Sequence, residues 1–348
     1  MKLAAISLIA GCVLPLASAA ADAVGDFYTG KTITLIISTG EGDGQDKTAR
    51  IISRHWTNHI PGKPVLVPKN MPGAGNLRAA NFIYDQAPKD GTAMAAIIPS
   101  FVLQQILGGP GVSYDANKMQ WLGSSNASNP TIYVWHTTGV KTIEDATKKE
   151  ILMGGTGAGS NSVLYPTIFN NMLGTKFKVI MGYRSTGDVN LATERGEVQG
   201  RAGETFNVLT ANEADWLRDK KINILVQIGR EKEKGFEYVP LATEFAKDQA
   251  TRDVLQVFSD VIALGRPYLA PPGIPVDRLT ALRTAFDEAM KDPALLADAQ
   301  KARLDISPTS GTTLQSVVAG MIKTNADVLA RVKAVIDASN APADDKGK

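Results

Sequence analysis

The sequence predicts an α/β protein with two lobes of similar build. Its 348 residues are more than one simple core usually holds. Short β-branched segments alternate with segments whose apolar residues recur at helical spacing, which is typical of βαβ units. This order of elements occurs in the first third of the chain and again in its middle, without an exact sequence repeat.

Three strands and two glycine-rich loops are predicted in the first third. Residues 32–37 are β-branched and almost wholly apolar toward their end, as in a strand that is buried on both faces. A glycine-rich loop over 40–46 leads into a helical pattern. The next strand is predicted at 65–67, and a loop over 70–76 precedes another helical pattern and a third strand at 92–98.

The middle of the chain repeats this organisation. Strands are predicted at 131–135, 150–153, 177–181 and 222–228. A glycine-rich loop over 154–161 precedes a helix, and a polar loop over 183–187 precedes another. Beyond a proline-rich connection at 270–275, apolar stripes predict helices that pack in a core, and residues 341–348 are predicted to be a disordered tail.

The N-terminus predicts export. Lys2 is followed by an apolar run over 3–16 and by Ala17-Ser18-Ala19, which is the pattern of a secretory signal peptide over residues 1–21. The apolar run is too short to span a bilayer. A second reading is a lipoprotein signal, in which Cys12 carries the lipid. Cleavage near Ala19 instead leaves no cysteine, and hence no disulfide or thiol chemistry.

Composition and motifs argue against several other classes of protein. A formal net charge of +2, with no basic stripe interleaved with aromatics, predicts no nucleic-acid partner. Residues 25–32 match the phosphate-loop pattern, but no strand is predicted before them and no helix after them. His55 and His59 lie four residues apart without the glutamate of a zinc protease, since position 56 is Trp56. We therefore predict no metal, no cofactor and no catalytic residue.

The glycine-rich loops are candidate anion sites. Each is predicted to lie between a strand and a helix, where a helix N-terminus offers unpaired N–H groups and a partial positive charge. Taken one at a time, the loops could equally be tight turns. Several of them in two βα halves favour a cleft at the carboxyl ends of the strands.

Several motifs, in order, resemble the Bug-type solute-binding receptors of tripartite tricarboxylate transporters. The resemblance covers essentially the whole predicted mature chain, and only the ordered set is specific. It rests on the segments 28–35, 44–50, 70–75, 87–92, 182–186 and 270–275.

The resemblance implies a periplasmic-binding-protein fold (type II-like), with two βα lobes joined by a hinge and a cleft between them. It places residues 22–124 and 263–340 in lobe 1 and residues 125–262 in lobe 2. It also implies a ligand that is a di-, tri- or aromatic carboxylate. The implied ligand-binding residues are Gly42, Asp43, Gly44, Gln45, Asp46, Gly73, Ala74, Gly75, Thr156, Ser160, Asn161, Tyr183, Arg184, Ser185 and Thr186.

Two positions depart from the family's pattern. The first loop has Gly40-Glu41-Gly42-Asp43 where relatives usually have two prolines and two glycines, and Val163 stands where a histidine is frequent. Arg184 is the candidate for a bidentate carboxylate clamp. A surface or interlobe ion pair is the other explanation for Arg184.

The predicted function is that of a periplasmic receptor, not an enzyme. It would capture a small organic carboxylate and deliver it to the membrane permease of a tripartite tricarboxylate transporter. Two alternatives remain at this stage: a periplasmic enzyme on the same fold, or a subunit that presents the ligand to a sensor kinase.

Overall fold

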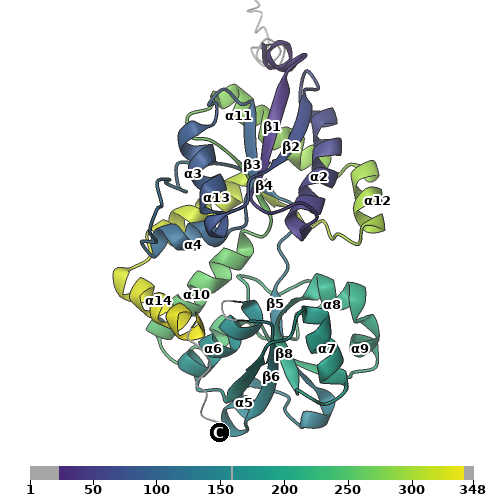
Figure 1. Ribbon diagram of the computed structural model, residues 1–348, viewed down its shortest axis with the longest axis vertical. Coiled ribbons are helices and arrows are strands. Elements are labelled where there is room, and N and C mark those ends of the chain that lie inside the picture. Colours follow the sequence, from purple (N-terminus) through teal and green to yellow (C-terminus); the bar gives the residue numbers. More distant parts are fainter. Residues whose placement is uncertain (1–22, 158–159, 341–348) are drawn as a thin grey trace, which may run out of the picture.

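The computed structural model describes residues 23–157 and 160–340, which form two lobes with one β-sheet each (Figure 1). The predicted signal peptide, Cys12 and the predicted tail lie outside these residues. None of the described helices is long and apolar enough to cross a bilayer.

The sheet of the first lobe has six strands in the order β11-β4-β10-β3-β1-β2. β1 pairs in parallel with β2 and β3, whereas β10 is antiparallel to β3 and β4 and therefore brings the C-terminal part of the chain into this sheet. The strands are β1 (Thr32–Ile37), β2 (Val65–Asn70), β3 (Ala93–Ala96), β4 (Gln120–Ser124), β10 (Pro267–Ala270) and β11 (Thr309–Ser310).

Helices cover both faces of this sheet, as the apolar character of β1 predicts. Ile33, Leu35 and Ile37 are buried on the face toward α2 and α11, and Ile36 is buried on the face toward α3, α4 and α13. The helices of this lobe are α2 (Gly44–Trp56), α3 (Leu77–Asn81), α4 (Ser100–Ile106), α11 (Val276–Ala289), α12 (Pro293–Lys301) and α13 (Gly311–Ile322).

The sheet of the second lobe has five strands in the order β7-β6-β8-β5-β9. Its strands are β5 (Pro130–Trp135), β6 (Ile151–Gly155), β7 (Phe177–Met181), β8 (Gly200–Thr205) and β9 (Ile222–Gln227). Its helices are α5 (Ile143–Lys148), α6 (Asn161–Leu173), α7 (Thr186–Glu194), α8 (Phe206–Asn212), α9 (Ala214–Arg218) and α10 (Gln249–Ala263).

Two of the segments that cross between the lobes form a hinge. One joins β4 to β5 and the other joins α10 to β10, and they bond to each other through Ser125 N to Arg266 O (3.2 Å) and Arg266 N to Asn126 O (2.9 Å). Gly265 has a φ of +58°, and a Cβ there would lie 2.0 Å from the carbonyl oxygen of Asn126. The hinge therefore requires glycine at position 265.

The last helix departs from the predicted division of the chain. The resemblance predicts residues 263–340 in lobe 1. Val328, Val332 and Val335 of α14 (Ala326–Asn340) instead lie in the same buried cluster as Phe169 of α6. Its apolar side chains pack on α6 and α10, so this helix belongs by its packing to the second lobe (Figure 1). The remaining lobe boundaries stay a prediction.

Candidate functional site

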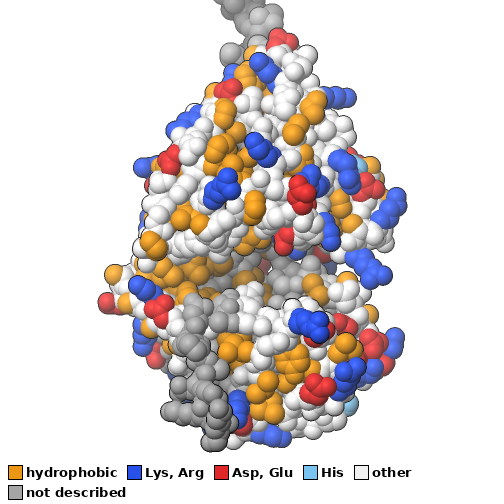
Figure 2. Space-filling model, viewed as in Figure 1, with side chains coloured by type: hydrophobic (Ala, Val, Ile, Leu, Met, Phe, Trp, Pro, Cys, Tyr) orange, Lys and Arg blue, Asp and Glu red, His pale blue; other side chains and the backbone are white. Residues whose placement is uncertain are grey.

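A cavity of about 470 Å³ lies between the lobes, beside the hinge. Its walls come from the residues after β3 and β8, from the start of α6, from the hinge segments, and from α10 and α14. In Figure 2 an opening separates the two lobes, and hydrophobic side chains gather beside it in the region of α4, α10 and α14. This is the position at which the sequence predicts a cleft.

The lining of the cavity is part polar and part apolar. The polar side chains include Ser100, Asn126, Ser128, Asn161, Thr205, Asn207 and Ser339, and the larger apolar ones include Leu103, Leu164, Phe258, Val261, Ile262 and Ile336. Arg266 is the one charged residue among the described residues that line it.

Arg266 connects the hinge to the first helix of the first lobe. Its Nη1 donates hydrogen bonds to the carbonyl oxygen of Gly44 (2.8 Å) and to the hydroxyl of Thr48 (2.6 Å). Within the described part of the chain, no carboxylate lies within ion-pair distance of this guanidinium. Arg266 thus presents a half-buried positive charge without a matching negative one.

The first predicted loop is occupied by its own acids. Asp43 is the N-cap of α2 and accepts a hydrogen bond from Gln45 N (2.8 Å). The carboxylate of Asp46 accepts hydrogen bonds from Gly42 N, Arg50 Nε and Asn70 Nδ2, each at 2.8 Å. Burial by itself would raise the pKa of Asp46, but these hydrogen bonds outweigh it and hold the pKa below its ordinary value. Asp43, which differs from the family's pattern at this position, therefore has a structural role as the cap of α2.

The second predicted loop lies exposed at the start of α3. Gly73, Ala74 and Gly75 all have positive φ, at 135°, 48° and 60°. Gln104 of α4 donates a hydrogen bond from Nε2 to the carbonyl oxygen of Gly75 (2.8 Å), which ties the loop to the first lobe. None of these three residues lines the interlobe cavity.

The third predicted loop leads into α6, whose N-terminus has no side-chain cap from the described residues. Ser160 is the N-cap, but it makes no side-chain cap hydrogen bond, and the first turn contains no acidic residue. The hydroxyl of Ser160 lies 2.8 Å from the hydroxyl of Ser162. The Ser162 hydroxyl also accepts a hydrogen bond from Thr156 N (3.1 Å). Asn161, in the first turn, lines the cavity. The partial positive charge of α6 is therefore available to an anion.

The fourth predicted loop lies outside the cavity lining. Ser185 is the N-cap of α7 and accepts a hydrogen bond from Asp188 N (3.1 Å). Arg184 is exposed, as are Ser185 and Thr186, and Tyr183 is half-buried. Of all the predicted site residues, Asn161 alone lines the cavity, and Gly44 touches it indirectly through Arg266. The role of Arg184 as a clamp stays a prediction.

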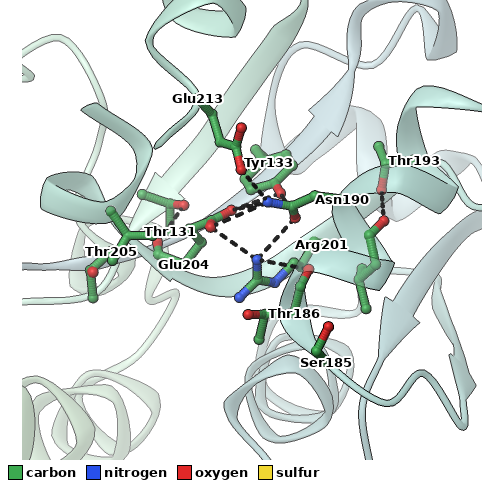
Figure 3. Close-up of polar contacts among 12 residues, drawn as sticks. Thr131, Tyr133, Ser185, Thr186, Asn190, Thr193, Arg201, Glu204, Thr205 and Glu213 are labelled. Carbon is green, nitrogen blue, oxygen red and sulfur yellow. Dashed lines mark hydrogen bonds and ion pairs between the residues drawn. The ribbon is translucent and has the colours of Figure 1, made fainter. Parts of the chain in front are cut away.

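A buried polar network lies behind the fourth loop (Figure 3). Arg201 Nη1 lies 3.0 Å from Glu204 Oε1, and the two side chains are 6% and 3% exposed. Asn190 Oδ1 accepts hydrogen bonds from Arg201 Nη1 and from the hydroxyl of Tyr133, both at 2.9 Å, and Asn190 Nδ2 donates to Glu213 (2.7 Å). Burial, together with the charge of Glu204, raises the pKa of Glu213.

A β-bulge brings the charged pair of this network together. In a regular strand, residues three apart face opposite sides. In the pairing of β5 with β8, Thr131 is opposite Glu204 and Ile132 is opposite Ala202. Gly203 is therefore an additional residue of β8 without a partner on β5, and its φ is +86°. Arg201 and Glu204 therefore share a face. The sequence does not predict this pair, because no strand is predicted over residues 200–205 and a bulge has no signal in the sequence pattern.

No protein-family model and no curated protein sequence matches the chain. Several solved structures, in contrast, match the chain. A TctC solute-binding protein from Polaromonas, without ligand, has a TM-score of 0.67 at 19% identity, over 89% of this chain and 99% of that protein. The periplasmic binding protein BugD has a TM-score of 0.55 at 15% sequence identity, over 88% of this chain and 98% of BugD. MatC from Rhodopseudomonas palustris, with bound malate, has a TM-score of 0.53 at 18% sequence identity, over 88% of this chain and 99% of MatC.

These likenesses cover nearly the whole described chain and show its fold. The predicted α/β architecture of two lobes, that of the periplasmic binding proteins, is confirmed. The neighbours are TctC- and Bug-type solute-binding proteins, which is the group whose motifs the sequence resembles.

Proposed function

We propose that this chain is an extracytoplasmic solute-binding protein, which captures a small organic carboxylate between its lobes and delivers it to a membrane permease. The observation that carries the proposal is the interlobe cavity, whose lining includes both Arg266, a cation without an ion-pair partner among the described residues, and Asn161 at the N-terminus of α6. Both features favour a bound anion. The malate in the structure of MatC is a carboxylate and supports the same class of ligand.

The location and the partner belong to the same proposal. The predicted signal peptide supports a periplasmic protein, and the likeness to TctC and BugD supports a permease of the tripartite tricarboxylate type. Ligand binding would close the lobes about the hinge at Gly265, and the permease would then select the closed form. We propose binding and release, with no chemical step.

Thermal melting of the mature chain (residues 22–348) against carboxylates, amines, sugars and nucleotides tests this function. A ligand at a hundredfold excess over its dissociation constant adds about 2.7 kcal/mol of stability, which is readily seen as a rise in melting temperature. We expect a rise with carboxylates alone. A rise with amines or sugars only would contradict the proposal.

Variants of Arg266 and Arg184 then show which of the two side chains binds the ligand carboxylate. A hydrogen bond to a charged group contributes about 1.5–3 kcal/mol, so loss of the clamp should weaken binding roughly 10- to 150-fold. We expect this loss for Arg266→Met and little change for Arg184→Ala, with calorimetric titration as the measurement. The reverse result would restore the clamp to the fourth loop.

A further inference from the structure

We infer that the ligand is an organic acid with a single carboxylate and an apolar body, held with its carboxylate toward Arg266 and its body against α10 and α14. This inference rests on the proposed function, because it specifies the ligand of the same cavity. It narrows the class of ligand that the sequence predicts, which comprises di-, tri- and aromatic carboxylates.

The charge of the lining supports one carboxylate. Arg266 is the sole charged group that the described residues contribute to the cavity. A second carboxylate on the ligand would lose water without gaining a cation, which is costly. A neighbouring cavity of about 520 Å³ differs sharply, since the charged residues 230–234 all line it.

The donors at the start of α2 are not available for a second carboxylate. Asp43 already accepts the hydrogen bond of Gln45 N, and Asp46 accepts that of Gly42 N. Both N–H groups are therefore already paired within the protein. The start of α6, a helix of 13 residues, has neither a side-chain cap nor an acid in its first turn, and its Asn161 lines the cavity.

The apolar part of the lining supports an apolar body. Val261 and Ile262 of α10, Ile336 of α14, Leu164 of α6 and Leu103 of α4 all line the cavity and are only partly buried. They come from both lobes and pack behind on the buried clusters. Their exposed faces would lose water against a hydrocarbon chain or ring, which is favourable in proportion to the area covered.

Calorimetric titration of the mature wild-type chain with two series of compounds tests the ligand class. The first series is butyrate, hexanoate, octanoate and benzoate, and the second is succinate, adipate and citrate, with 1-hexanol as the neutral probe. We expect affinity to rise about fourfold per added methylene from butyrate to octanoate, the equivalent of about 0.8 kcal/mol. Hexanoate should bind at least tenfold more tightly than adipate or 1-hexanol.

The outcomes separate this inference from the function on which it rests. Tighter binding of succinate or citrate than of hexanoate would overturn the single carboxylate and leave the receptor function standing. Equal binding of 1-hexanol and hexanoate would overturn the role of Arg266. Silence from every carboxylate would overturn the receptor function itself.

A matched pair of variants on α14 tests the apolar wall. Ile336→Gln places a polar group on the wall, whereas Ala334→Gln makes a similar change at an exposed position of the same helix. We expect the gain in affinity from butyrate to octanoate to fall at least fivefold in Ile336→Gln and to persist in Ala334→Gln. If Ile336→Gln melts much lower than wild type, Val261→Ala makes the same test from α10. An unchanged gain in a folded wall variant would contradict the inference.

Discussion

Replacing Glu204 by glutamine should lower the free energy of unfolding by about 3–5 kcal/mol, because the guanidinium of Arg201 is then buried without its carboxylate. Oε1 of Glu204 lies 3.0 Å from Nη1 of Arg201, and neither side chain is more than 6% exposed. A glutamine keeps the shape of the side chain and retains an oxygen that can accept a hydrogen bond. The loss therefore measures the charge, and it is a large part of a typical folding free energy of about 5–15 kcal/mol.

Urea-induced unfolding followed by far-UV circular dichroism measures this loss. Glu150→Gln is the matched control in the same lobe, because its partner Lys178 is 4.0 Å away and the two side chains are 63% and 61% exposed. Such a pair contributes less than about 1 kcal/mol. The double variant Arg201→Met/Glu204→Leu removes both charges and should recover much of the stability. If Glu204→Gln costs no more than Glu150→Gln, the reasoning about the buried pair is refuted.

Two further predictions concern the first lobe and the hinge. Gly265→Ala should unfold at a lower urea concentration than Gly273→Ala: both residues have positive φ, which costs an alanine about 1–2 kcal/mol, but only at Gly265 would the new Cβ meet a backbone oxygen. Equal midpoints would argue against a tightly packed hinge. A hydrogen bond with His55 holds the pKa of Asp298 below its ordinary value of 3.8, so the stabilisation is present above about pH 4 and is lost as the pH falls through the folded-state pKa. Asp298→Asn should therefore melt lower at pH 7 and lose less stability below pH 4 than wild type, and an unchanged acid slope would contradict this.

Local sequence patterns predict the strands well where the side chains are β-branched. The predicted strands at 32–37 and 177–181 coincide with β1 and β7. β8 was missed because its sequence contains two glycines and two charged residues, Arg201 and Glu204, and reads as a polar loop. Its residues form a strand because β5 and β6 pair with it on either side, which is a tertiary effect.

Of the site residues that the sequence predicts, one, Asn161, lines the interlobe cavity. The ligand-binding role of the glycine-rich loops stays a prediction. Arg266, Ile262 and Ile336 carry no local signal of a site. They meet because the chain crosses between the lobes at the hinge and because α14 returns to pack on α6 and α10. Such contacts depend on the whole topology, and a single sequence does not display it.

Of the four helices that begin at the predicted loops, α3 has only five residues, and the other three, α2, α6 and α7, differ in the groups that already bond to their N-termini. α2 has the carboxylates of Asp43 and Asp46 in place, and α7 has the hydroxyl of Ser185 as its cap and Asp188 in its first turn. α6 alone among these three has neither a side-chain cap hydrogen bond nor an acid. Because an N-terminus that is already neutralised gains little from a further anion, we expect a ligand carboxylate at the start of α6 rather than at the starts of α2 or α7. Asp43, in the segment where the family's pattern has two prolines and two glycines, binds Gln45 N, so this N–H group serves the cap of α2.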